Sequence, residues 1–221
     1  TGHFVVATTH TQARYALPTI IKWFKSDYPK VHLALHQGSP KEIADMLTSG
    51  AADVGIATEG LDESPEIATF PFYRWHHAVI VRKDHPLLRA GAVTLEALSE
   101  YPIITYHEGF TGRAHVDKAF ADAGIVPDIV LSAIDADVIK TYVDLDLGVG
   151  IIASMAYDAD KDRNLSLIPV PELFPSNTTR LAVRRGTYLR SYAYAFIEKV
   201  CPDVGEEAVR AALSKQNGSD S

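Results

Sequence analysis

The chain has 221 residues, of which 47% are hydrophobic and 22% charged, and this is ordinary globular usage that allows one large core or two smaller ones. Its formal net charge of −7 disfavours direct nucleic-acid binding, because phosphate contacts need clustered basic residues and here 21 of them are scattered among 28 acidic ones. No apolar run approaches the roughly 18 to 20 residues of a membrane-spanning helix, so we expect no membrane partner.

The single cysteine and the first residues of the chain indicate its cellular compartment. Cys201 is the single cysteine, which excludes an internal disulfide and is typical of a reducing compartment, so we expect a cytoplasmic protein. The chain begins at Thr1 and enters a strand pattern at once, without the charged and hydrophobic segments of a secretory signal. We therefore interpret it as a fragment or a processed product.

The first quarter of the sequence alternates strand-like and helix-like segments. Strands are predicted at 3–8, 31–37 and 52–58, and helices at 17–29 and 39–50. Strands separated by helices are joined by right-handed crossovers and so lie parallel in one sheet.

The helix at 39–50 has the most complete terminal signals. Ser39 is placed as the N-cap, Pro40 at the first helical position, Glu42 as the partner in a capping box, and Gly50 at the end.

A second alternation follows a polar loop and a strand pair, 67–87, which we expect to bend around Pro71. The chain then leaves one strand, 179–185, and one helix, 190–202, after the second set is complete. The second set is predicted as helices at 94–98, 111–124 and 135–148 and strands at 101–106, 128–133 and 149–154. This predicts two α/β subdomains, with the last strand and helix returning to the first.

We accordingly expect three parts in the chain. Residues 1–72 plus 174–201 form subdomain I, residues 73–173 form subdomain II, and residues 202–221 form a disordered C-terminal tail.

Patterns for enzyme and metal chemistry are weak. The segment 148–153, GVGIIA, matches a dinucleotide motif but follows a helix pattern and opens a strand, which is the reverse of what that site needs. His76 and His77 would point to opposite faces of a strand, so structural or surface histidines are favoured over a metal site. With no nucleophile motif in the sequence, we expect no enzyme, no metal and no cofactor.

Polar residues gather after several predicted strands. Thr8, Thr9 and Thr11 follow the first strand, Thr58 and Glu59 the third. Residues 106–112 and 135–137 follow two strands of the second set. Ligands of open α/β sheets bind at the carboxyl ends of the strands, and helix N-termini there favour anions. Helix capping explains any one of these residues about as well as ligand binding does, but it explains the whole set poorly.

Five stretches of the sequence identify a family. TTHTQARYALP, HQGSP, ADVGIATE, FTGR and DADVIKTYV resemble the effector-binding portion of LysR-type transcriptional regulators, in the cysteine-regulon subgroup. The resemblance extends to about Cys201. It implies an α/β fold of two Rossmann-like subdomains joined by two crossover strands, similar to type 2 periplasmic binding proteins, with an effector in the interdomain cleft.

The resemblance also implies the effector contacts. The residues carried over from the family are Thr9, Thr11, Gln12, Thr58, Thr111, Gly112, Asp135 and Ala136, with Trp75 and Glu59 near the hinge and cleft. Family effectors are sulfate, thiosulfate, acetylserine and adenosine phosphosulfate, so a sulfate-like anion or acetylserine is expected in place of a cofactor. A periplasmic-type binding protein for a small oxyanion is the alternative.

The partners implied by the family are DNA and further copies of the chain. DNA would be bound only through an N-terminal winged helix-turn-helix domain that this chain lacks. We expect a homodimer or homotetramer in which the helix around Ile21–Lys25 and the strand Val31–Gln37 meet the partner's helix around Val116–Phe120.

Overall fold

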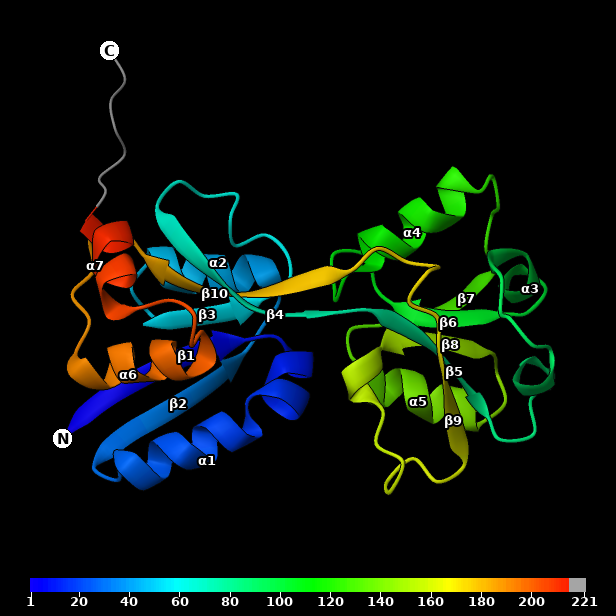
Figure 1. Ribbon diagram of the computed structural model, residues 1–221, viewed down its shortest axis with the longest axis horizontal. Coiled ribbons are helices and arrows are strands. Elements are labelled where there is room, and N and C mark those ends of the chain that lie inside the picture. The colour runs from blue at the N-terminus through cyan, green and yellow to red at the C-terminus, as the bar shows by residue number, and fades with distance from the viewer. Residues whose placement is uncertain (215–221) are drawn as a thin grey trace, which may run out of the picture. The chain divides into compact units, whose positions relative to one another are not determined.

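The computed structural model describes residues 1–214 and divides the chain into two compact units (Figure 1). Unit 1 comprises Thr1–Tyr73 and Thr178–Ser214 of the described residues, and unit 2 comprises Arg74–Asn177. The chain therefore leaves unit 1 once and returns to it once. The first division, after Tyr73, lies one residue beyond the boundary that we expect from the sequence, and the second, after Asn177, lies four residues beyond it.

Unit 1 is built on a five-stranded sheet of order β2-β1-β3-β10-β4. Its strands are β1 Gly2–Thr8, β2 Val31–Gln37, β3 Val54–Ala57, β4 Ile67–Trp75 and β10 Asn177–Arg184. Strand β1 pairs in parallel with both β2 and β3, whereas β10 runs antiparallel to β3. The carboxyl ends of β1 and β3 therefore lie at the same edge of the sheet.

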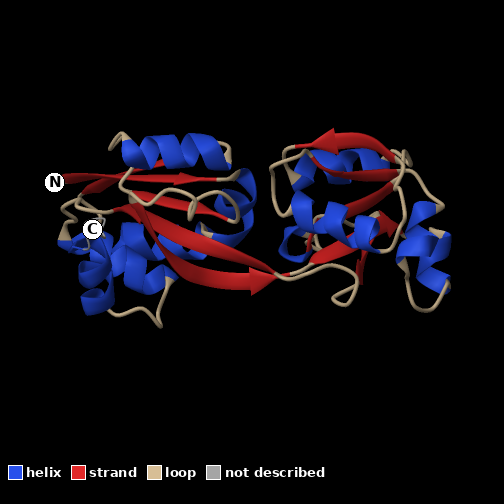
Figure 2. Cartoon of the chain, turned by 90° about the horizontal axis from the view of Figure 1, so that it is seen from above, coloured by secondary structure: helices blue, strands red, loops and turns tan. Residues whose placement is uncertain are grey.

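Helices cover both faces of this sheet (Figure 2). They are η1 Gln12–Ala16, α1 Pro18–Asp27, α2 Pro40–Thr48, α6 Ser191–Val200 and α7 Glu206–Ser214. On one face Phe4, Phe24 and Phe196 meet in an aromatic core between β1, α1 and α6. On the other face Ile43 and Leu47 of α2 pack onto the sheet.

Helix α2 begins where its sequence signals place it. The Ser39 hydroxyl accepts a hydrogen bond from the Glu42 backbone N–H at 3.2 Å, and Gly50 has a φ of +78° just beyond the end. The helix lies so close to β3 that a Cβ at Gly55 would come within 2.8 Å of both Ile43 and Leu47. Glycine in the strand therefore sets the distance between the two elements.

Unit 2 repeats this arrangement with a sheet of order β7-β6-β8-β5-β9. Its strands are β5 His77–Arg82, β6 Ile103–Tyr106, β7 Ile129–Ala133, β8 Val149–Ala153 and β9 Leu165–Pro169. Strand β6 pairs in parallel with β7 and β8, and β5 runs antiparallel to β8 and β9.

The helices of unit 2 follow the strands in the predicted alternation. They are η2 Pro86–Arg89, α3 Leu95–Ser99, α4 Arg113–Asp122, α5 Ala136–Asp144 and η3 Ser154–Ala156. Val79, Ile103, Phe120 and Ile151 lie in a second hydrophobic core, separate from that of unit 1. Each unit thus buries apolar surface of its own.

The structure corrects two expectations about the strands. Strand β4 runs without a break through Pro71, and the interruption falls at His76. Strand β4 lies at the edge of the sheet, and proline is tolerated in edge strands because part of their backbone N–H groups faces away from the ladder. Strand β9, which the sequence analysis does not predict, closes the second sheet at its other edge.

The expected disordered tail is wrong for residues 206–214, which form helix α7. Val209 and Leu213 are buried in the core of unit 1, and the Arg185 guanidinium donates to the carbonyl of Ala212 at 2.7 Å. Apolar residues four apart give this short segment one face to bury, and that outweighs its polar neighbours. The remaining part of the expected tail, 215–221, lies outside the described residues.

Among the helices of residues 1–214, none is both long enough and apolar enough to cross a bilayer.

Candidate functional site

Threonine hydroxyls cluster at the carboxyl edge of the sheet of unit 1. Thr8 ends β1 and is paired in register with Ile56 of β3, so Thr9 and Thr58 leave the sheet from the same edge. The Thr9 N–H donates to the Ile56 carbonyl at 3.4 Å, which ties the two strand ends together. Thr8 and Thr9 are both buried. The predicted grouping of polar residues after β1 and β3 is present.

The next residues form a π-helical turn, in which the Leu17 N–H donates to the Gln12 carbonyl five residues earlier at 2.9 Å. Such turns occur often at functional sites. Gln12 is buried within the turn, and its side-chain Oε1 accepts a hydrogen bond from the Tyr73 hydroxyl at 2.6 Å. This bond fixes the side chain, so that Gln12 is held in one orientation at the edge of the sheet.

Thr11 stands out because its hydroxyl is buried and unpaired. The residue is 1% exposed, and within residues 1–214 its Oγ1 has no hydrogen-bond partner. It precedes the π-helical turn but makes no side-chain cap. A buried hydroxyl without a partner carries a desolvation penalty of about 1–3 kcal/mol, so such a group needs an explanation.

Thr58 and Tyr73 are linked to the same edge by hydrogen bonds. The hydroxyls of Thr58 and Thr179 lie 3.1 Å apart, across β3 and β10. Burial raises the pKa of Tyr73 above its ordinary value of 10.0, against smaller lowering effects of its hydrogen bonds to Thr179 and Gln12. The phenol therefore stays neutral and donates. Glu59, directly after Thr58, is half-buried.

In unit 2 the turn that carries Thr111 and Gly112 opens helix α4. Both residues have left-handed backbones, with φ of +44° and +70°, and both are buried. Gly112 is the N-cap of α4 and provides no side-chain cap. Arg113 begins the helix and is occupied by Asp117 at 2.8 Å and by the Tyr106 carbonyl at 2.8 Å. The polar groups of the turn are therefore its backbone and the Thr111 hydroxyl, while the charge of the adjacent Arg113 is balanced by Asp117.

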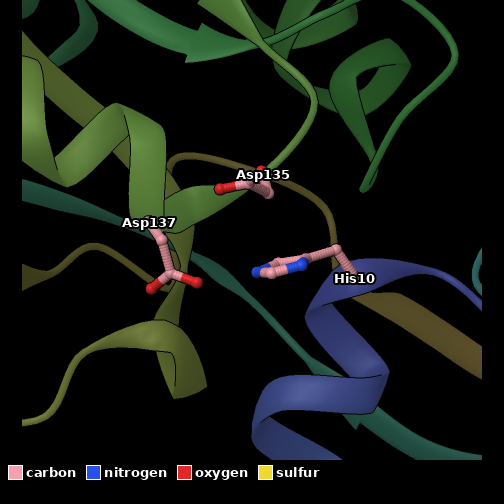
Figure 3. A group of neighbouring side chains, drawn as sticks. All are labelled: His10, Asp135 and Asp137. Atoms are coloured by element: carbon pink, nitrogen blue, oxygen red, sulfur yellow. The ribbon is translucent and has the colours of Figure 1, made fainter. Parts of the chain in front are cut away.

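Asp135 and Ala136 lie at the start of α5, and the structure gives both a structural role. The Asp135 carboxylate accepts from the Val138 N–H at 2.9 Å as the helix N-cap, and Ala136 is fully buried. Figure 3 shows Asp135 where the chain enters α5, Asp137 on the first turn of that helix, and His10 ahead of the π-helical turn of unit 1. Helix capping is sufficient to explain Asp135.

Trp75 ends β4 and is buried, with its ring centroid 4.9 Å from that of His77. Its ring packs in an edge-on geometry against the imidazole at the start of β5. His77 and Asn177, which the sequence analysis does not assign to the site, are 1% exposed and hydrogen-bonded to each other at 3.3 Å. The only sequence signal for them is the paired histidine.

The fold and these turns define a class of protein. The family model for the LysR substrate binding domain matches residues 1–200, and the chain belongs to that family. Its members are effector-binding portions of transcription regulators and not enzymes. The alternative of a periplasmic solute-binding protein is not favoured, because the curated relatives are named as regulators.

Within the family the chain belongs with regulators of sulfur and cysteine genes. It is 56% identical over 212 residues to the transcriptional regulator SsuR and 51% identical over 212 residues to CysB, both from Burkholderia cenocepacia. It is 48% identical over 197 residues to the regulator cbl of Escherichia coli. These alignments cover 96%, 96% and 89% of this chain, but 69%, 68% and 62% of the relatives.

Solved structures agree with this assignment. The cofactor-binding domain of the Cbl transcriptional regulator superposes with a TM-score of 0.95 at 44% identity, covering 98% of this chain and 95% of that one. The effector-binding domain of QuiR in complex with shikimate shares the fold, with a TM-score of 0.80 at 20% identity over 91% of this chain and 96% of that one.

Proposed function

We propose that this chain senses a small sulfur metabolite for a LysR-type regulator of sulfur assimilation. The ligand is a sulfate-like anion, such as sulfate, thiosulfate or adenosine phosphosulfate, or acetylserine. The regulator works in the cytoplasm and reaches DNA through a segment outside this chain. The observation that carries the proposal is the unpaired, buried hydroxyl of Thr11 at the carboxyl edge of β1.

The chemistry of this edge suits an anion held by neutral donors. Thr9, Thr11 and Thr58 supply hydroxyls, and Gln12 supplies an amide whose oxygen is already engaged by Tyr73, so its NH₂ group is left to donate. We propose that Thr111 supplies a further hydroxyl beside Gly112, at the N-terminus of α4, where the helix dipole favours negative charge. Neutral donors bind less tightly than a buried cation, so the ligand leaves when its concentration falls.

Titration calorimetry of the chain with sulfate, thiosulfate, acetylserine and adenosine phosphosulfate tests the ligand class. We expect at least one of them to bind with a single site per chain, and phosphate at equal concentration to bind less well. If none of the four releases or absorbs heat at millimolar concentration, the sulfur assignment is wrong.

Replacing Thr11 with valine keeps the shape of the side chain and removes the hydroxyl. Because a hydrogen bond to a charged partner contributes roughly 1.5–3 kcal/mol, we expect the affinity for the bound ligand to fall by about tenfold to a hundredfold. Stability should not fall, because the lost hydroxyl has no partner in the ligand-free fold.

The matched control is Thr105→Val, which removes a buried hydroxyl that donates to the Ile151 carbonyl at 2.9 Å within the core of unit 2. We expect that variant to lose stability and to keep its affinity. Equal affinity of Thr11→Val and the wild-type chain for every ligand that binds would contradict the placement of the site.

We also propose that the chain forms a homodimer through α1 and the edge strand β2. Leu35 of β2 is 38% exposed, and a charged residue there should disrupt an apolar contact. We expect Leu35→Lys to weaken dimerisation at least about tenfold in sedimentation experiments, whereas Leu88→Lys, at an equally exposed leucine of unit 2 (39%), leaves it unchanged. A wild-type chain that stays monomeric at high concentration would contradict the proposal.

The expected partner helix around Val116–Phe120 is α4, and its burial pattern limits which of its residues can meet a second copy. Val116 and Phe120 are fully buried in the core of unit 2 and are not available to a second copy. The exposed face of α4 carries Ala114, Lys118 and Ala121 instead. Any contact through this helix must use those residues.

A further inference from the structure

Two segments of the chain are fastened together where unit 2 begins and ends. The Arg74 guanidinium donates to the Ser176 hydroxyl at 2.8 Å, and the Asn177 side-chain amide lies 3.3 Å from Nδ1 of His77. The partners in the second pair are 100 residues apart in sequence. These bonds join the end of β4 and the start of β5 to the residues that lead into β10, and we call these two stretches, 74–77 and 176–177, the crossing segments.

His77 makes one more bond, and it reaches the turn that opens α4. Its Nε2 lies 2.9 Å from the backbone carbonyl of Thr111. A carbonyl only accepts, so Nε2 carries the proton and Nδ1 accepts from the Asn177 amide. One neutral imidazole ring therefore connects the two crossing segments with the Thr111–Gly112 turn.

The turn needs to be held from outside. Thr111 has a φ of +44°, and for a residue other than glycine the left-handed region costs roughly 1–2 kcal/mol. Such a conformation persists only where surrounding contacts impose it. The bond from His77 is a contact of this kind, because it fixes the carbonyl of the strained residue itself.

The ring of His77 has little freedom to move. It is 1% exposed and lies against the rings of Trp75 and Phe174, with centroids 4.9 Å and 5.9 Å away. On the side of the turn, a Cβ at Gly112 would overlap Asn177 Oδ1 and lie 2.7 Å from His77 Cε1. The turn and the histidine–asparagine pair are thus packed in direct contact.

We propose that His77 is a positioning residue for effector binding, which holds the Thr111–Gly112 turn in its binding conformation and ties that turn to the two crossing segments through Asn177. The inference rests on the proposed function, because it takes the turn as an effector contact. A change in the turn on effector binding then reaches both crossing segments through one side chain.

Two substitutions at His77 separate positioning from packing. His77→Leu fills a similar volume and makes neither hydrogen bond, whereas His77→Gln retains an amide that can donate to the Thr111 carbonyl. Calorimetry with the best binder among the four sulfur compounds should show that His77→Leu binds about tenfold more weakly or worse and that His77→Gln stays within about threefold of wild type.

The remaining variants separate the possible failures. Thr105→Val, which loses a hydrogen bond elsewhere in the core of unit 2, should be destabilised without losing affinity. If His77→Leu keeps wild-type affinity while Thr11→Val loses it, the positioning role is wrong and the proposed function stands. If the affinity of His77→Leu, Thr11→Val and Thr105→Val falls in proportion to the decrease in their melting temperatures, the effect is one of stability and positioning by His77 is overturned. If the wild-type chain binds none of the four compounds, the proposed function itself fails.

Discussion

Replacing Gly112 with alanine is expected to destabilise the folded chain by roughly 2–5 kcal/mol and to abolish measurable effector binding. The left-handed backbone of Gly112, with φ of +70°, accounts for about 1–2 kcal/mol of this effect. Overlap of the new Cβ with Asn177 Oδ1 and its 2.7 Å approach to His77 Cε1 add about 1–3 kcal/mol, because both side chains are buried and cannot retreat into solvent. Urea unfolding measures the loss.

Gly109 provides a matched control in the same turn region. Its φ is +83°, but a Cβ there would meet no atom within 4 Å. Gly109→Ala should therefore show the backbone effect alone. Equal stability of the two alanine variants would mean that contact between Gly112 and the histidine–asparagine pair does not constrain the turn.

When the pH is lowered from 7.5 to 5, the free energy of unfolding of the wild-type chain is expected to fall by roughly 2 kcal/mol more than that of the His77→Gln variant. Burial lowers the pKa of His77 from 6.5 to about 4, with smaller lowering effects of His115 and His76 and an opposing effect of the Thr111 carbonyl. Between these two values the unfolded chain binds the proton and the folded chain does not. The contribution is therefore complete above about pH 6.5 and is lost as the pH falls toward 4.

Other groups also titrate in this range, so the measured quantity is the difference between variants. Unfolding free energies of the wild-type chain, His77→Gln and His36→Gln are compared at both pH values. His36 is exposed, so its replacement is the control for removing a surface histidine. A wild-type profile in His77→Gln would show that His77 does not resist protonation in the folded chain.

Local sequence signals predicted most of the fold because each helix and strand carries them within its own residues. Ser39, Glu42 and Gly50 define α2 before any tertiary contact is known, and the alternation of Val31–Gln37 defines β2. The expectations failed where position in the sheet decided the outcome. Pro71 is harmless because β4 is an edge strand, and nothing in the local sequence states which strands lie at the edge.

Helix α7 shows a second kind of failure, because the composition and the periodicity of its residues indicate different structures. The polar residues around Glu206 favour a disordered tail, yet the apolar pair Val209 and Leu213 lies on one helical face and is buried in unit 1. The core that receives these side chains is assembled from distant parts of the sequence.

The candidate site could be predicted in part, from the position of polar residues after parallel strands. Thr9, Thr11 and Thr58 all meet this criterion, and their common edge follows from the pairing of β1 with β3. Asp135 meets it as well, although its N-cap role is sufficient to explain it. Asn177 could not be predicted in this way, because it joins His77 only through a contact across 100 positions of sequence.

The most direct test of the proposed site is amide chemical-shift mapping of the ¹⁵N-labelled chain during titration with its best sulfur ligand. We expect the largest shifts on two separate segments, Thr9–Gln12 and Thr111–Gly112, and we expect both to saturate at the same ligand concentration. Shifts confined to one of these segments, or centred on residues such as Tyr188–Tyr192 at the start of α6, would contradict the proposed site.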